Sequence, residues 1–191
     1  CHCACLHSNT GPAKTVILWP SLPESHSAPN SMDFESLSKK MTRAAVQGNG
    51  STVVDCFTVD GVYHDVFYGD FTGRNIARMI EDYFHRDGKN FRWDIFDPVE
   101  KRNKGYARYV FSYDSRLKNF ENKRAIFEGV AICTLSNGKI SDYREIATAT
   151  TGLALMGFPP TKISKFVTRE ADALVKRPES TSHLTTSSTR S

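Results

Sequence analysis

The sequence predicts an α+β fold in which a curved antiparallel sheet forms a cone, covered by N-terminal helices and a C-terminal helix. Three observations predict it. Apolar side chains recur mostly at helical spacing over 33–84, alternate with the period of strands over 91–148, and return to helical spacing over 163–174. Helices followed by a meander of long strands are typical of domains whose helices lie on one face of a sheet.

The N-terminal part is expected to form two helices. Asp33 can cap the first, in which Phe34, Leu37 and Met41 fall at helical spacing. A short second helix, capped by Ser51 and extending to Phe57, is expected next.

The Asp60-Gly61 turn leads into a short strand over 62–67. Thr72 is then expected to cap the clearest helix of the chain. Its apolar stripe consists of Ile76, Met79, Ile80, Tyr83 and Phe84.

Four strands are expected after Gly88, over 91–97, 106–113, 124–135 and 139–148. The dipeptide Asn137-Gly138 predicts a type I′ hairpin turn between the last two. A final helix over 163–174 places Ile163, Phe166, Val167 and Leu174 on one face.

The length of 191 residues and the 39% hydrophobic content suit one domain with tails. We expect residues 1–31 to be a disordered N-terminal extension, 32–177 to be the folded domain, and 178–191 to be a disordered Ser/Thr-rich tail. Met32 stands directly before the first helical pattern and is interpreted as the natural start.

The net charge of +4 and its dispersed distribution do not favour a nucleic-acid partner. No apolar run reaches the roughly 18 residues of a membrane span, so no membrane association is expected. Cys56 and Cys133 lie in apolar settings, which favours free thiols and a cytoplasmic location. The opening Cys1-His2-Cys3 pattern lacks a second ligand pair at zinc-finger spacing, so no metal site is expected.

A bent sheet with helices on its concave side leaves a hollow lined by every second strand residue. Tyr63, Asp65 and Phe67 share one face of the first strand, and Tyr143 and Glu145 share one face of the last. Alternation alone does not show which face is inside.

Several short motifs, in their order and spacing, resemble one known family. They are Tyr63-His64-Asp65, Gly73-Arg74, Phe127-Glu128-Gly129 and the run from Asn137 to Glu145. With these residues the stretch from Met32 to Ala173 resembles the SnoaL-like branch of the nuclear transport factor 2-like superfamily. The run from Tyr143 to Pro160 is also similar to the phenazine-biosynthesis A/B proteins of that superfamily.

The resemblance implies roles for two acids. Glu145 matches the catalytic acid of the family's aromatic-Arg-acid motif, and Asp65 matches the position that carries the general base in ketosteroid isomerase. We therefore expect Glu145 and Asp65 to be catalytic, placed on facing walls of the cone. We expect Tyr63, Tyr143, Trp93, Phe67 and Arg108 to contact the substrate.

The sequence also departs from individual members of the superfamily. The stretch 107–111 lacks the Arg-x-Asp pair that epoxide hydrolysis needs, and Ala131 stands near the position of the second acid of ketosteroid isomerase. The helix histidine of the phenazine proteins is replaced near Met79 and Ile80. The resemblance therefore carries the fold better than any one member's chemistry.

Structural roles are the alternative for both acids. Asp65 can cap a loop or pair with Arg74 or Arg78, and Glu145 can pair across the sheet with Arg108 or Arg124. His64 is expected on the other face of the strand, away from the ligand.

Three hypotheses about function follow. The first is a lyase, isomerase or cyclase that acts on a small hydrophobic molecule without a cofactor, for which paired carboxyl groups are suited. The second is a non-catalytic binding domain, in which Glu145 would be salt-bridged and its pKa lowered. The third is a homodimeric interaction module that uses the exposed face of the sheet.

Overall fold

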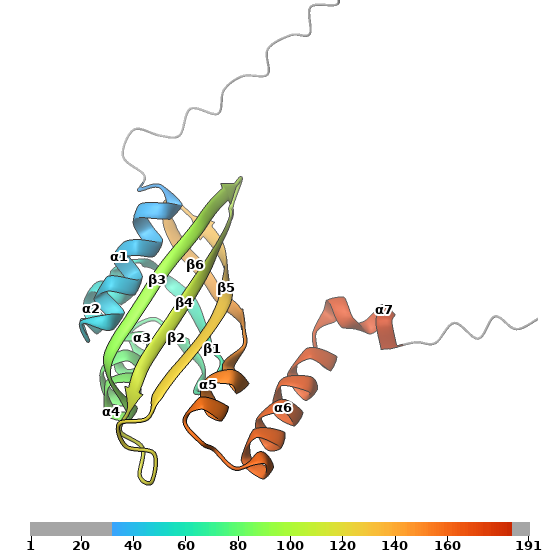
Figure 1. The fold of residues 1–191 in the computed structure, drawn as a ribbon. Coiled ribbons are helices and arrows are strands. Elements are labelled where there is room, and N and C mark those ends of the chain that lie inside the picture. The colour runs from blue at the N-terminus through green and yellow to red at the C-terminus, as the bar shows by residue number, and fades with distance from the viewer. Residues whose placement is uncertain (1–31, 185–191) are drawn as a thin grey trace, which may run out of the picture. The chain divides into compact units, whose positions relative to one another are not determined.

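A computed structural model describes residues 32–184 of the chain (Figure 1). The expected extension over 1–31, with its cysteine-rich start, and residues 185–191 lie outside the described residues. The helices are α1 (Phe34–Val46), α2 (Gly50–Asp55), α3 (Asn75–Arg78), α4 (His85–Asp87), α5 (Ala149–Leu155), α6 (Pro160–Val175) and α7 (Thr181–Leu184). The strands are β1 (Phe57–Asp65), β2 (Gly69–Thr72), β3 (Gly88–Lys101), β4 (Lys104–Ser115), β5 (Arg124–Ser136) and β6 (Lys139–Ala147).

The six strands form one sheet in the order β2-β1-β6-β5-β4-β3. The α+β class is confirmed, but the sheet is mixed, because β1 runs parallel to β6 while all other neighbours are antiparallel. The reason is topological: the meander β3 to β6 brings the last strand back beside the first. This register pairs Tyr63 with Tyr143, and it decides the geometry of the site.

Local sequence signals form the turns and caps as predicted. The Asp33 side chain accepts a hydrogen bond of 2.7 Å from the Ser36 N–H and begins α1. Asn137 and Gly138 both have positive φ, 50° and 72°, as a type I′ turn between β5 and β6 requires.

Several expected boundaries differ from the structure, and two of them place a residue in the wrong type of element. Phe57 begins β1 instead of ending the second helix, because its amide group lies after the C-cap at Cys56. Thr72 ends β2, a strand that the sequence analysis did not predict, instead of capping a helix. The helical stripe that follows is continuous but winds as a π-helix over Met79–Phe84, between α3 and α4.

The core lies between the N-terminal helices and the inner face of the sheet. Phe34, Leu37 and Met41 of α1 are almost fully buried, as are Tyr109 of β4 and Tyr143 of β6. Burial of such side chains supplies the main favourable free energy of the fold. Both cysteines of the described part, Cys56 and Cys133, are buried free thiols.

The C-terminal segment is helical for longer than expected. Residues 178–184, assigned above to a disordered tail, form a 3₁₀ turn over Pro178–Ser180 and then α7. The preceding helix α6 has no fully buried residue. Its Phe166 ring lies 5.4 Å from the Phe67 ring. None of the helices in residues 32–184 has the length and apolar character needed to cross a membrane.

Candidate active site

A hollow opens between the inner face of the sheet and the segments that follow β1 and precede β3. It is lined mostly by aromatic rings, with three carboxyl groups among them. Its walls are formed by Tyr63, Asp65, Val66, Phe67, Tyr68, Phe84, Asp87, Gly88, Phe91, Trp93, Tyr109, Phe111, Tyr113, Phe127 and Glu145. The space open to the centres of water molecules is about 30 Å³. This space suits ordered water, so a larger ligand requires the aromatic side chains to move.

Glu145 lies on β6 and points into this hollow. Its Oε2 atom accepts hydrogen bonds from the hydroxyl groups of Tyr109, at 2.5 Å, and Tyr143, at 3.3 Å. Burial raises the pKa of Glu145 to about 7, with a further contribution from the charge of Asp65, and the two phenols oppose this rise. The carboxyl group therefore exchanges a proton near neutral pH.

Asp65 lies at the end of β1 and lines the same hollow. Its Oδ1 atom accepts the backbone N–H groups of Phe67, at 2.8 Å, and Tyr68, at 2.9 Å. Burial raises the pKa of Asp65, while these two hydrogen bonds and the charge of Arg169 lower it. The loop-capping alternative is thus observed, but Oδ2 accepts no hydrogen bond within residues 32–184 and is available to a ligand.

The parallel register of β1 and β6 places the two acids side by side. Tyr63 pairs with Tyr143, and two residues further along each strand come Asp65 and Glu145, on the same face. The expectation that they occupy facing walls is therefore wrong. Neighbouring carboxyl groups in a buried site disfavour double ionisation, which helps to keep one of them protonated.

Tyrosines support Glu145 from two strands. The Tyr63 ring stacks on the Tyr143 ring with centroids 4.4 Å apart, and burial raises the pKa of both phenols well above the usual range. Burial also raises the pKa of Tyr109. All three hydroxyl groups are therefore protonated near neutral pH, and those of Tyr109 and Tyr143 donate to Glu145. Tyr63 lines the hollow as expected, whereas Tyr143 does not form part of its wall and reaches the site through Glu145.

Trp93 and Phe67 both line the hollow, as the sequence analysis predicted. The Trp93 indole meets the rings of Tyr109 and Phe111 edge to face, at 5.7 and 5.1 Å between centroids. Its buried Nε1–H has no hydrogen-bond partner among the described residues. An indole donor of this kind can donate to an oxygen atom of a ligand.

Arg108 was expected to contact the substrate, and this prediction is wrong. Arg108 is exposed, pairs with Asp97 at 3.2 Å and lies over the Phe96 ring. Alternation along β4 explains its position, because the buried neighbours Ala107 and Tyr109 face inward and Arg108 therefore faces outward.

Neither arginine considered as a partner of Glu145 contacts it. Arg108 is bound to Asp97, and Arg124 donates to Asp114 at 3.0 Å. Within residues 32–184, Glu145 forms no ion pair at all. The salt-bridged alternative for this residue is therefore not observed.

Ten of the lining residues were not predicted, and three of them form side-chain hydrogen bonds with one another or with Glu145. Tyr109 makes the shortest hydrogen bond to Glu145, and the hydroxyl group of Tyr68 donates to Asp87 at 3.0 Å at the rim of the hollow. The sequence of β4 already indicated that Tyr109 faces inward, because Arg108, Ser112 and Asp114 lie at alternate positions and share one face of the strand. Polar residues on that face place the opposite face, which includes Tyr109, on the inside.

No metal centre is found in the described part of the chain, where no cluster of three or more His, Cys, Asp or Glu side chains is close enough to hold an ion. The hollow offers carboxyl groups and phenols without a histidine among its lining residues.

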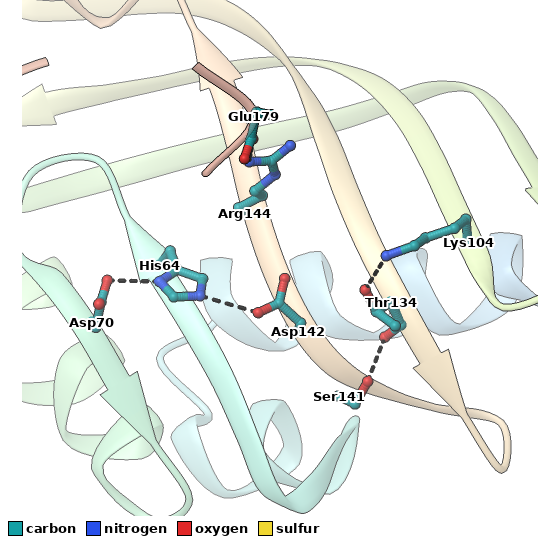
Figure 2. A network of polar contacts seen from close by, with 8 residues as sticks. All are labelled: His64, Asp70, Lys104, Thr134, Ser141, Asp142, Arg144 and Glu179. Carbon is teal, nitrogen blue, oxygen red and sulfur yellow. Dashed lines mark hydrogen bonds and ion pairs between the residues drawn. The ribbon is translucent and has the colours of Figure 1, made fainter. Parts of the chain in front are cut away.

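His64 lies on the face of β1 opposite Asp65. Figure 2 shows its ring between two carboxylates, with Nδ1 at 2.7 Å from Asp70 and Nε2 at 3.1 Å from Asp142. Burial lowers the pKa of His64, but the two carboxylates outweigh it and the net shift is upward. This network links β2, β1 and β6 on the outer face and takes no part in the hollow.

The raised pKa of His64 predicts a pH-dependent stability. The protonated form of His64 is favoured in the folded chain. The contribution of His64 to the free energy of unfolding is therefore complete below its unfolded pKa of about 6.5, and it is lost as the pH rises through its higher pKa in the folded chain. Urea unfolding of the wild-type and His64→Gln proteins should therefore show a larger difference in free energy near pH 6 than near pH 9. If the difference in the free energy of unfolding between the two proteins is constant or grows with pH, His64 does not form the described contacts with Asp70 and Asp142.

The comparisons with known proteins agree with this architecture. The family model of the SnoaL-like domain matches residues 39–143, more than half of the chain, and ends two residues before Glu145. No curated protein gives a match to the sequence.

Solved structures with this fold are distant in sequence. A hypothetical protein with a ketosteroid isomerase-like fold from Catenulispora acidiphila, in complex with trimethylamine, has 15% identity and a TM-score of 0.58, covering 64% of this chain and 93% of that chain. IdmH, a putative polyketide cyclase from Streptomyces antibioticus, has 15% identity and a TM-score of 0.54, with coverages of 64% and 97%. An NTF2-like protein from Burkholderia thailandensis has 10% identity and a TM-score of 0.52, with coverages of 64% and 95%. At such identities the likeness establishes the fold alone.

Proposed function

Because the chain belongs to the SnoaL-like family, we propose that its hollow carries out cofactor-independent acid/base chemistry on a small hydrophobic molecule, by dehydration, isomerisation or cyclisation. The observation that supports this proposal is Glu145. Its carboxyl group is held by two phenols, has no ion-pair partner within residues 32–184, and has a pKa raised by burial to about 7. Such a group both accepts and donates a proton at working pH.

The position of its oxygens fits this role. Both phenols bond to Oε2, and Oε1 accepts no hydrogen bond within the described residues. Oε1 can therefore take a proton from a carbon or oxygen of the substrate, while the phenols hold the carboxylate in place. Asp65 stands on the next strand as the second carboxyl group. Aromatic walls keep bulk water away from the two acids and strengthen the electrostatic interactions inside.

The proposal is tested with a substrate that reports proton abstraction alone. In the ring opening of 5-nitrobenzisoxazole, a base removes the ring C–H proton, the N–O bond breaks, and a coloured cyanonitrophenolate forms. We expect saturable catalysis whose rate rises with pH, with a midpoint near the pKa of about 7 of Glu145, and levels off above it. A rate equal to that of acetate buffer would reject the proposal.

The two phenols provide a graded prediction. Each lowers the pKa of Glu145 by donating to its charged form, and the Tyr109 bond is shorter than the Tyr143 bond. Tyr109→Phe should therefore raise the pKa of Glu145 above about 7, and Tyr143→Phe should raise it less. Titration of the side-chain carboxyl carbon by NMR measures both shifts, and the reverse order would show that the two bonds are assigned wrongly.

The non-catalytic alternative is less well supported. It requires a salt-bridged Glu145 with a lowered pKa, whereas burial raises the pKa of Glu145 and this residue forms no ion pair within residues 32–184. Tight binding of small molecules without any ring-opening activity would favour it.

We also propose a homodimer formed through the outer face of the sheet. Six large apolar side chains are exposed on neighbouring strands there: Phe96, Val99, Tyr106, Ile126, Val130 and Ile146. Val130 pairs in register with both Arg108 and Ile146 and lies within this patch. An isologous contact would cover it. Sedimentation velocity at micromolar concentration should show a dimer for the wild type and a monomer for Val130→Glu, and a wild-type monomer would contradict the proposal.

A further inference from the structure

The walls of the hollow have an unusual balance of charge. Ten of the lining residues are aromatic and three are acidic, and the lining includes no Lys, Arg or His. The acid Asp87 is neutralised from outside the hollow, since Arg86 pairs with it at 2.6 Å. Asp65 and Glu145 form no ion pair within residues 32–184, and the only cation that acts on Asp65 is the exposed Arg169, which does not contact it.

The groups that hold these two acids are dipoles and not cations. Asp65 receives two backbone N–H groups, and Glu145 receives two phenol hydroxyl groups. Arg169 on α6, whose charge lowers the pKa of Asp65, is exposed and donates to the carbonyl oxygens of Val66 and Phe67. A buried site with this composition repels an anionic ligand and stabilises a cationic one.

The aromatic rings add a second source of attraction for a cation. Trp93 meets Tyr109 and Phe111 edge to face, so that rings stand at steep angles to one another and form corners in the wall. Ring faces attract alkylated ammonium groups, and tryptophan does so most strongly. Carboxylates next to ring faces therefore make a receptor for an alkylammonium ion.

We propose that the hollow binds a small organic ammonium ion, with its cationic nitrogen between the ring faces and the carboxyl groups of Asp65 and Glu145. This inference rests on the proposed function, because it uses the same site and names its substrate class. The orphaned Nε1–H of Trp93 adds a further feature, since an oxygen atom on the ligand would accept its hydrogen bond. Because the open space is about 30 Å³, the aromatic side chains must move to admit even a compact organic ammonium ion.

A pair of probes with the same shape isolates the charge. Choline carries a quaternary nitrogen and a hydroxyl group, and 3,3-dimethylbutan-1-ol replaces that nitrogen with carbon. Isothermal titration calorimetry at about pH 8 and low salt should show choline binding at least about tenfold more tightly, as expected for an attraction of cation–π and ion-pair type. Equal or tighter binding of the neutral alcohol, or no binding of choline, would overturn the inference.

The pH dependence tests where the cation binds. The groups facing Glu145 are Asp65 on β1 and the phenols of Tyr63, Tyr109 and Tyr143, whose raised pKa values keep them protonated over this range. Asp87 with Arg86 and the exposed Arg169 complete the charges nearby. Choline has no proton to lose near pH 7, so a proton released on binding comes from the protein. We expect such release, together with an affinity that rises from about pH 6 to pH 8.

Variants complete the experiment. Glu145→Gln should abolish the proton release and weaken the preference for choline, which Asp65 and the ring faces still support, whereas Asp142→Asn, on the opposite face of the same strand, should leave both unchanged. If Glu145→Gln keeps the proton release and the full preference for choline, the inference is overturned. The number of protons that the wild-type protein releases on binding choline tests the inference even if that variant does not fold. Binding is measured without turnover, so the two proposals can fail separately. If choline is not preferred, a ring opening that depends on Glu145 still supports the proposed function. If the ring opening is not catalysed, a preference for choline still supports the ammonium site.

Discussion

Replacing Glu145 with glutamine is expected to lower the catalysed ring opening of 5-nitrobenzisoxazole by about 10²–10⁴-fold, the usual contribution of a general base. Glutamine has nearly the same shape, and its amide oxygen can still accept the hydrogen bond from Tyr109. It cannot take up a proton at neutral pH. The loss should therefore fall on the chemical step, seen as a lower kcat with little change in KM.

The stability of this variant separates catalysis from folding. Glu145 is a buried carboxyl group without an ion pair in the described part of the chain, so its removal relieves a cost of burying charge. We expect the free energy of unfolding of Glu145→Gln at pH 8 to equal or exceed that of the wild type. Asp142→Asn serves as the matched control, because it makes the same acid-to-amide change on the outer face of β6. A rate in Glu145→Gln similar to that of this control would exclude Glu145 as the base.

The elements that the sequence predicts well are those with local signals. The cap at Asp33 and the turn at Asn137-Gly138 depend on residues only a few positions apart. The parallel pairing of β1 with β6 joins residues such as Tyr63 and Tyr143, which are far apart in the chain. No local pattern encodes that pairing, and so the side-by-side placement of Asp65 and Glu145 was not predicted.

The candidate site was predicted in part for a related reason. The order of motifs identified Asp65 and Glu145, and the structure brings both to the hollow. Period-two alternation gives the two faces of a strand but not which one is buried. Arg108 was therefore assigned to the inside and Tyr109 was missed, although the two are neighbours on β4. The face could have been assigned from the polar residues Arg108, Ser112 and Asp114 at alternate positions of β4, and Gly129 of β5, which pairs with Tyr109, leaves room for its ring.

Gly129→Ala should couple a loss of stability to a change in the active site. A Cβ atom at this position would lie 2.6 Å from the Tyr109 hydroxyl oxygen and 2.7 Å from the Ile146 carbonyl oxygen, closer than real Cβ contacts. The carbonyl belongs to the backbone of β6 and cannot move without shifting the strand. Both clashes are relieved only if the backbone of β6 and the Tyr109 side chain move away from position 129, which disturbs the hydrogen bond between Tyr109 and Glu145. Overpacking of this kind costs about 1–3 kcal/mol in the free energy of unfolding.

The effect on Glu145 distinguishes this site from an ordinary core position. Because the Tyr109 hydrogen bond lowers the pKa of Glu145, its loss should raise that pKa and move the midpoint of the pH–rate profile upward. Gly105→Ala is the control, since its Cβ would meet the Phe34 ring at 2.5 Å, on α1 and without contact to Glu145. It should reduce stability in urea unfolding and leave the midpoint unchanged. If both glycine variants shift the midpoint equally, the shift follows from general loosening of the core, and Tyr109 does not hold Glu145 in the way that the structure indicates.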